Sequence, residues 1–522
     1  MPTKPPARRV RLAACTAATA VAVTLTATTP TSATTAAAPA RALARYEHQK
    51  ITWTRCTTGP SDDVGKALDQ AGAQCARLRV PLDYSRPAGR GITVAISRLK
   101  ANDREHRVGA MLLNGGGPGG GSIDLPPDIR DLMNGVGARY DLIGMDPRSS
   151  GRSTPVDCRW PTSTWMRSPG FGRKGFDKVA AMERGLAARC RKTDGDLLPY
   201  ISTRNTARDM DVVRAALGEP RLSYYGASYG TYLGAVYAQM FPGRVGRMVL
   251  DSAVDPDDYG AQDMLADAAP ANEQALHDWA AWAAAHDTTY HLGATRGAVL
   301  TTVNRVIAAA RKPLKVGDYL VDDQVVPFVL FNGLDDDRDT ASASLAGAVR
   351  VLKEAADGRQ AEPTPDLADT LHFLFTGVES PASSSQVAVL CGDKAVDRDP
   401  RTYGDRIQAA RRSRPVLGPL LGDISPCAFW PATPGEAPTA IHNGVPVLMV
   451  NSTGDTRTTY QDALALHRRL TGSRLLTLQG ARIHAVYPRY GNACVNDTVN
   501  EYFRTGSLPG TDLTCSASER VR

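Results

Sequence analysis

Short apolar runs alternate with amphipathic segments through the first half of the chain. Residues 206–217 place apolar side chains at helical spacing and end at a Gly-Glu-Pro stop, and residues 229–240 form a second such segment, rich in small residues. The apolar runs between the helical segments have the length of buried strands, at 92–97, 109–114, 140–146, 222–225 and 247–251. Strands that alternate with helices in this way predict a mainly parallel sheet with helices on both faces.

The pattern changes around residue 256. Residues 256–385 are rich in Ala and Asp and carry mostly helical periodicity, so we expect a helical insertion, or cap, over the sheet. The strand pattern returns from about Val387, with strong buried strands at 445–450 and 473–478. The expected organisation is therefore a core in two parts, residues 46–255 and 386–522, separated by a helical cap at 256–385.

The amino terminus has the pattern of a secretion signal. A basic start precedes a short apolar run, and small residues follow, so we expect residues 1–40 to be removed by cleavage between 40 and 45. Arg8-Arg9 leaves open whether export is general or of the twin-arginine type. Since no later segment has eighteen consecutive apolar residues, we expect a secreted protein without stable membrane association.

Charge and cysteine content narrow the classes of partner. Four of the net +7 charges lie in the leader, so the mature chain would carry about +3, which does not indicate nucleic acid as a partner. Eight cysteines remain after the leader, and an even number in an exported chain favours disulfides. They allow 105 pairings, of which loop economy favours neighbours: 56–75, 158–190, 391–427 and 494–515. No spacing indicates zinc, and we expect no metal and no cofactor.

Candidate chemistry starts at Gly226-Ala227-Ser228-Tyr229-Gly230, which fits the G-x-S-x-G nucleophile elbow between a strand and a helix. The strained turn leaves no room for side chains at the two glycine positions. Ser228 could equally be a small residue at a tight turn, and with 47 glycines in the chain a chance match is common. Neighbouring features have to decide.

Two later segments offer the base and the acid that a serine nucleophile needs. Asp455 follows the predicted strand at 445–450, and His484 follows the one at 473–478. Ser228, Asp455 and His484 stand in the chain order of α/β-hydrolase triads, each after a strand. The other histidines considered lie in the insertion, on a charged helix face or in early loops: His277, His286, His467, His48 and His106.

A glycine-rich loop, residues 114–122, follows the strand at 109–114. It lacks the Lys-Ser/Thr of a phosphate-binding P-loop. In a hydrolase this loop supplies one oxyanion donor and the residue after the nucleophile supplies the other. We expect the N–H groups of Gly117 and Tyr229 in these roles, with Ser228 as the nucleophile.

Over essentially the whole mature chain, the sequence resembles the secreted tripeptidyl-aminopeptidase branch of the α/β-hydrolases, which are relatives of prolyl aminopeptidases. The resemblance is carried by "CARLRVPLDYSRP", "NGGGPGGGS", "YDLIGMDPRSSGRSTPVDC", "YAQMFPGRVGRMVLDSAVDP", "STGDTRTTYQDA" and "GNACVNDTVNEYFRTGSLPGTDLTC". It implies an α/β-hydrolase fold and a serine exopeptidase with Ser228, Asp455 and His484 as its triad. It also implies peptide or protein N-termini as substrates, short peptides, expected to be tripeptides, as products, and a cap that helps to hold the substrate's amino group.

Three segments depart from the family's usual pattern. Ser149-Ser150 follows Arg148 where the family has Gly, Asp455 is followed by Thr-Arg-Thr-Thr in place of Pro-Val-Thr-Pro, and His484 lacks its flanking glycines. These changes affect the expected shape of the substrate pocket. The acidic run at 335–339 is more simply a solvated loop or helix start than an amine site. A carboxylesterase of the same fold and a non-catalytic binding protein on a hydrolase scaffold remain alternative functions.

Overall fold

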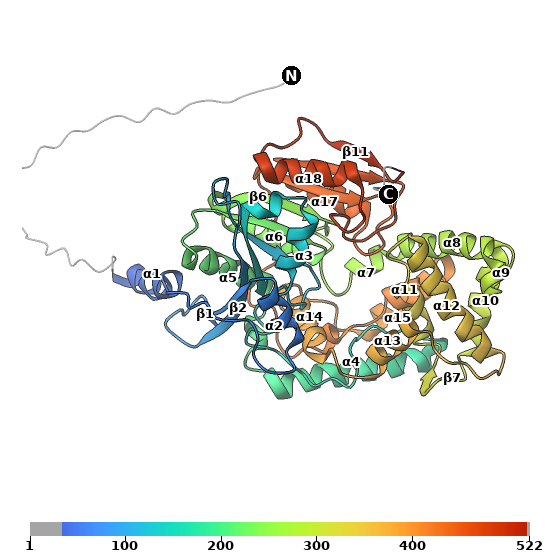
Figure 1. Cartoon of the computed structure of the whole chain (residues 1–522). Coiled ribbons are helices and arrows are strands. Elements are labelled where there is room, and N and C mark those ends of the chain that lie inside the picture. Colours follow the sequence, from blue (N-terminus) through green and yellow to red (C-terminus); the bar gives the residue numbers. More distant parts are fainter. Residues whose placement is uncertain (1–33, 519–522) are drawn as a thin grey trace, which may run out of the picture.

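The computed structural model describes residues 34–518 and is built around one nine-stranded sheet (Figure 1). The strand order is β1-β2-β4-β3-β5-β6-β9-β10-β11. β2 pairs antiparallel with both β1 and β4, and every pair from β4 to β11 is parallel. The strands are β1 (Gln74–Pro81), β2 (Gly91–Leu99), β3 (Gly109–Asn114), β4 (Tyr140–Asp146), β5 (Leu222–Ala227), β6 (Val245–Asp251), β9 (Val447–Ser452), β10 (Ser473–Gln479) and β11 (Leu513–Ser516).

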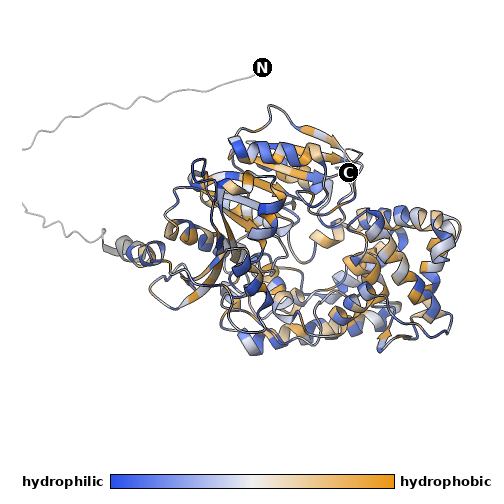
Figure 2. Ribbon diagram, in the orientation of Figure 1, coloured by the Kyte–Doolittle hydropathy of each residue, from blue (hydrophilic) through white to orange (hydrophobic). Residues whose placement is uncertain are grey.

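Helices cover both faces of the sheet, because successive strand side chains point to opposite sides. In β9, Val447 and Met449 pack in a cluster with residues of α5, α6 and α17, whereas Leu448 and Val450 pack with residues of α3 and α18. Figure 2 shows hydrophobic colour on these central strands and also on the cap helices. The helices of the core are α1 (Thr34–Glu47), α2 (Asp63–Gln70), α3 (Leu125–Leu132), α4 (Gly172–Asp194), α5 (Thr203–Ala216), α6 (Tyr229–Met240), α17 (Tyr460–Arg469) and α18 (Ala493–Thr505).

The insertion between β6 and β9, which contains the proposed cap, is helical and has a hydrophobic core of its own. It adds only one short antiparallel hairpin, β7 (Leu314–Val316) with β8 (Tyr319–Val321). Its helices are α7 (Met264–Asp267), α8 (Ala269–Ala285), α9 (Asp287–Tyr290), α10 (Arg296–Ala309), α11 (Val326–Asn332), α12 (Asp339–Ala356), α13 (Pro365–Phe375), α14 (Ser380–Asp393), α15 (Pro400–Ser413) and α16 (Gly418–Leu421).

The helical region extends further along the chain than the expected boundary. Position 385 falls inside α14, two more helices follow it, and the sheet resumes only at Val447. The apolar run from Val387 to Leu390, which has the length of a buried strand, is a helix whose four residues are all buried. Ser149 and Ser150, which follow Arg148 where the family pattern has Gly, tie α14 to the core: their hydroxyls bond that of Ser385 at 2.6 and 2.9 Å.

All eight cysteines in the described part of the chain are paired, and the pairs are the sequence neighbours that loop economy favours: Cys56–Cys75, Cys158–Cys190, Cys391–Cys427 and Cys494–Cys515. Most of the expected leader, residues 1–33, lies outside the described residues. Within 34–518, no helix has both the length and the apolar character needed to cross a bilayer.

Candidate active site

Ser228 stands at the sharp turn between β5 and α6. Its backbone lies at φ 57° and ψ −127°, in a region that residues with a side chain rarely adopt. The two neighbouring glycines are needed for space: a Cβ at Gly226 would lie 2.5 Å from the oxygen of Gly230, and one at Gly230 would lie 2.8 Å from that of Asn114. The turn therefore has the geometry of a nucleophile elbow and presents Ser228 at the carboxyl end of the sheet.

His484 and Asp455 lie next to each other in the loops after β10 and β9. The ring Nδ1 of His484 is 3.0 Å from each carboxylate oxygen of Asp455. The side chain of Asp455 is fully buried and that of His484 is 16% exposed. Burial alone would raise the pKa of Asp455, but the charge of His484 and several hydrogen bonds outweigh it and hold that pKa below its ordinary value. The carboxylate is thus kept ionised beside the imidazole.

The residues after Asp455 fix its carboxylate from the other side. The backbone N–H groups of Arg457 and Thr458 donate to Asp455 Oδ1 at 2.8 and 3.1 Å, and the hydroxyl of Thr458 donates to Oδ2 at 3.2 Å. The same hydroxyl is 3.5 Å from His484 Nδ1. With all of these partners in place, the acid has a single orientation toward the ring.

The loop that carries His484 is anchored by Asp251 and Ser252, at the end of β6. The carboxylate of Asp251 accepts the N–H groups of Val486 at 3.0 Å and Tyr487 at 2.7 Å, and the hydroxyl of Ser252 accepts that of Ala485 at 2.8 Å. Sequence reasoning missed both anchors, since nothing local to residues 251–252 marks them. The only available signal was an acidic residue at the carboxyl end of a predicted strand.

The glycine-rich loop after β3 lies between the elbow and the cap. A Cβ at Gly116 would come within 2.7 Å of the oxygen of Ala227 and 2.8 Å of Ser228 Cβ, and one at Gly119 would lie 2.4 Å from the oxygen of Ala382 in α14. The loop passes directly against Ser228, which is the position expected of an oxyanion loop. No hydrogen bond within residues 34–518 engages the N–H of Gly117 or that of Tyr229.

One cavity brings these groups together. Ser228, His484, Gly117 and Tyr229 all line a cavity of about 320 Å³. Most of its other walls are apolar side chains from the core and from the cap helices. The remaining lining residues are Gly115, Trp165, Met166, Val254, Ala261, Met264, Leu265, Phe331, Gln386, Leu390, Arg457 and Thr458. The three expected triad residues and the two expected oxyanion residues thus share one site, with Asp455 buried directly behind His484.

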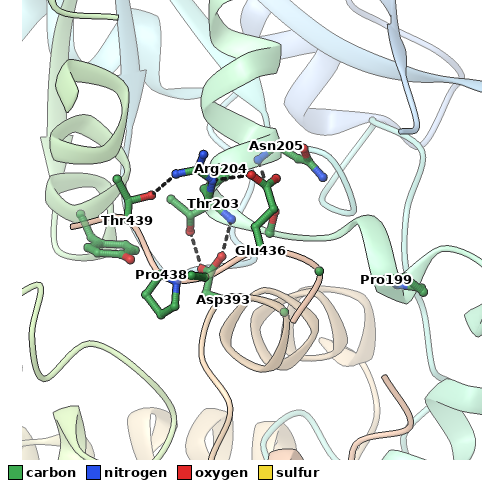
Figure 3. A pocket seen from close by; sticks show the side chains of 13 residues that line it. Pro199, Thr203, Arg204, Asn205, Asp393, Glu436, Pro438 and Thr439 are labelled. Carbon is green, nitrogen blue, oxygen red and sulfur yellow. Dashed lines mark hydrogen bonds and ion pairs between the residues drawn. The ribbon is translucent and has the colours of Figure 1, made fainter. Parts of the chain in front are cut away.

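A buried polar chain behind Tyr229 connects the elbow to the cap. The Tyr229 and Thr203 hydroxyls are 2.7 Å apart, and Thr203 Oγ1 donates to Asp393 of α14 at 2.5 Å (Figure 3). Asp393 also accepts the N–H of Thr203 at 2.7 Å and the hydroxyl of Tyr259 at 2.9 Å. Burial raises the pKa of Asp393 to about 6. Tyr229 and Thr203 of the core therefore share one buried hydrogen-bond network with Asp393 of the helical insertion.

The acidic run at 335–339 ends in a helix start, because the exposed Asp339 begins α12, but its earlier residues do not form a solvated loop. Asp336 is 3% exposed and forms an ion pair with Arg338. The backbone oxygen of Asp335 accepts the N–H of His484 at 3.0 Å. The carboxylate of Asp337 accepts the backbone N–H of Arg482 at 2.7 Å. The run instead fastens the cap to the segment that carries His484. His467, one of the competing histidines, lies on α17, where its ring contacts Ser473 and Asp512.

A mainly parallel sheet in this strand order, with a serine elbow after β5 and an aspartate–histidine pair after later strands, defines an α/β-hydrolase. The family model described as "TAP-like protein" matches residues 415–515. The tripeptidyl aminopeptidase of Streptomyces lividans is 35% identical over 499 residues, covering 91% of this chain and 88% of that protein. A serine protease of Mycobacterium tuberculosis is 29% identical over 514 residues, covering 90% of this chain and 91% of that protein. The carboxylesterase B of the same organism is 32% identical over 497 residues, covering 89% of this chain and 90% of that protein.

The chain belongs to the tripeptidyl aminopeptidase family. It is a serine hydrolase of the peptidase kind.

Proposed function

We propose that this chain is a secreted serine exopeptidase that releases tripeptides from free N-termini of peptides or proteins. The observation that carries the proposal is the single cavity in which Ser228 and His484 meet the two N–H groups suited to an oxyanion, with His484 paired to buried Asp455. Ser228 is the nucleophile, His484 the general base and Asp455 the orienting acid.

The chemistry follows from the proton positions. Because Nδ1 of His484 donates to ionised Asp455, Nε2 is left as the acceptor that takes the Ser228 proton. Ser228 Oγ then attacks the scissile carbonyl, and the N–H groups of Gly117 and Tyr229 bind the oxyanion. His484 returns the proton to the leaving amine, and water, activated by the same base, hydrolyses the acyl-enzyme to free the short peptide.

The cap supports an exopeptidase over an endopeptidase. Met264, Leu265, Phe331, Gln386 and Leu390, all from the cap, contribute to the walls of the cavity. A cavity of about 320 Å³ that the cap walls on one side suits a short acyl segment that enters by its end. No Asp or Glu is among the described residues that line it, and we assign no residue to the substrate's ammonium group.

Secretion is proposed on two grounds. Residues 1–40 have the basic, apolar and small-residue order of an export signal. Four disulfides hold the described chain, and such bonds form and persist in oxidising compartments outside the cytosol.

The test compares three substrates on the mature protein and its Ser228→Ala variant: a tripeptide p-nitroanilide with a free amino terminus, its N-acetylated twin, and a short p-nitrophenyl ester. We expect the wild-type protein to cleave the anilide with a free amino terminus but not its N-acetylated twin. The Ser228→Ala variant is expected to cleave neither. Turnover of the ester without either peptide would instead support an esterase, the function named for one 32% identical relative. Failure of a serine-reactive phosphonate to label Ser228 would revive the non-catalytic binding protein.

A further inference from the structure

Arg457 is a cation in the wall of the active-site cavity. It stands two positions after Asp455, to which its backbone N–H donates, and its side chain lines the cavity together with Ser228 and His484. No other Lys or Arg, and no Asp or Glu, is among the described lining residues. The charge at this position therefore acts directly on whatever fills the cavity.

The guanidinium is held by neutral groups from the cap. It lies 3.7 Å from the ring centre of Phe331, and Nη2 donates to the backbone oxygens of Phe331 at 2.6 Å and Asn332 at 3.4 Å. Nη1 donates to the side-chain oxygens of Asn272 at 3.2 Å and Thr456 at 3.3 Å. These contacts fix its position, and none of the contacting groups carries a negative charge.

Within residues 34–518 no carboxylate forms an ion pair with Arg457, and its Nε–H has no hydrogen-bond partner. Asp335 and Asp455 act on it only at longer range, and burial lowers its pKa to about 10. The fully buried Arg148, by contrast, is paired through two nitrogens with Asp209. A desolvated arginine that is fixed but unpaired has the features of a site for a carboxylate ligand.

The cation at position 457 departs from the pattern that the family resemblance implies. The family resemblance leads us to expect Pro-Val-Thr-Pro after the acid, and here the segment is Thr456-Arg457-Thr458-Thr459. An apolar position in the family pattern has become a charged one, so the consequence concerns substrate choice and leaves the triad chemistry unchanged.

We propose that Arg457 is a specificity-determining residue that pairs with a carboxylate of the peptide substrate, so that acidic peptides are cleaved in preference to neutral ones. The inference rests on the proposed peptidase function. The carboxylate has two possible sources, the side chain of Asp or Glu within the released tripeptide and the terminal carboxylate of a short peptide, which share the same chemistry.

The experiment measures kcat/KM for matched pairs of substrates. Tripeptide p-nitroanilides with a free amino terminus carry Glu or Gln at one of the three positions in turn, and a tetrapeptide carries a terminal carboxylate or a terminal amide. We expect the wild-type protein to prefer the charged member of at least one pair by about ten- to a hundredfold, the range for a hydrogen bond to a charged group. The responding pair identifies the source.

Three variants assign that preference. Arg457→Met is expected to bring the ratio close to one, and Arg457→Lys to keep part of it. Arg482→Met is the matched control, because Arg482 also joins the His484 segment to the cap, through the backbone oxygens of Leu334 and Asp336, but does not line the cavity. It is expected to leave the ratio unchanged, whatever its effect on stability.

The proposal is overturned if no pair is distinguished by the wild-type protein, or if Arg457→Met lowers kcat/KM for charged and neutral substrates alike, as a mere cap anchor would. If Arg457→Met does not fold, a loss of the charge preference in the control Arg482→Met as large as that in Arg457→Lys would also overturn the proposal, because the preference would then not depend on the charge in the cavity wall. Cleavage of the Gln peptides with no charge preference refutes this inference alone. Absence of any peptide cleavage by protein that still labels at Ser228 refutes the peptidase function instead.

Discussion

The backbone oxygen of Asp251 accepts the N–H of Ser228 at 2.9 Å. The carboxylate of the same residue accepts two N–H groups from the loop just after His484. One residue at the end of β6 therefore sets the distance between the nucleophile's backbone and the loop that carries its base. The geometry of the site depends on this strand as well as on the three that carry Ser228, Asp455 and His484.

Asp251→Asn is expected to destabilise the protein and lower kcat. An amide has one acceptor oxygen for two donors, so either the N–H of Val486 or that of Tyr487 loses its partner, at a cost of about 1–3 kcal/mol. Urea unfolding at neutral pH and kcat on the tripeptide anilide measure the two effects. The exposed Asp128→Asn is the control, and equal behaviour of the two variants would contradict the anchoring role.

The pH dependence of stability should also change in Asp251→Asn. Burial is the largest effect on Asp251 and raises its pKa from 3.8 to about 6. The folded state then holds this proton more tightly than the unfolded state, so the contribution of Asp251 to stability is complete below about pH 4 and is lost as the pH rises through 6. The loss is about 3 kcal/mol by the usual conversion. The difference in unfolding free energy between the wild type and the variant, measured from pH 4 to pH 7, isolates the contribution of Asp251. A difference that does not change with pH would rule this contribution out.

Asp455→Asn is expected to lower kcat by about 10³–10⁴ while the protein stays folded. The amide group can donate to Nδ1 of His484, so the imidazole proton moves to Nε2. A protonated Nε2 cannot accept the proton of Ser228. Steady-state kinetics and thermal unfolding together check this. Retention of more than a tenth of the wild-type kcat would show that Asp455 does not orient the base.

Gly116→Ala is expected to abolish activity, because its Cβ would overlap the oxygen of Ala227 and Cβ of Ser228 at 2.7 and 2.8 Å. Gly120→Ala, in the same loop, is the matched control, since its Cβ meets only the oxygen of Gly116 at an ordinary 3.5 Å. Phosphonate labelling of Ser228 and kcat/KM on the anilide compare the two. If both variants lose activity equally, the loop tolerates no side chain at either position. The close approach of Gly116 to Ser228 would then no longer explain the loss of activity.

Thr203→Val removes one hydroxyl that bonds both Tyr229 and Asp393, without changing the volume of the side chain. We expect a loss of about 1–3 kcal/mol in unfolding free energy, with a smaller decrease in kcat through Tyr229. Thr206→Val lies on the same helix, where its hydroxyl donates to the oxygen of Ser202, and should cost less. A larger effect at position 206 than at 203 would argue against the chain through Asp393.

The sequence predicts most of the sheet strands and the position of the candidate site residues at one edge of the sheet, because both depend on local rules. A buried strand needs an apolar run, an elbow needs glycines on both sides of Ser228, and residues after parallel strands meet at one edge. The elements after Val387 were harder, since α14 is buried along its apolar run and so lacks the polar face that distinguishes a helix from a buried strand. The sheet therefore resumes at Val447, later than the return near Val387 that the pattern indicates.

The contacts that support the site could not be predicted in this way. Asp251 meets the His484 loop, Asp393 meets Thr203, and Arg457 meets the cap only in three dimensions, because each pair is far apart in the chain. Asp393 and Arg457 lie in or beside segments of ordinary polar composition. The cysteine pairing, in contrast, follows the simplest rule of short loops in all four cases.

The cap divides the site along the chain: Ser228 precedes it, and Asp455 and His484 follow it. A ribosome must therefore complete nearly the whole polypeptide before base, acid and nucleophile can coexist. A nascent chain that carries the elbow and the entire cap still has no activated serine. The proposed triad is therefore complete only when synthesis of the chain is nearly finished.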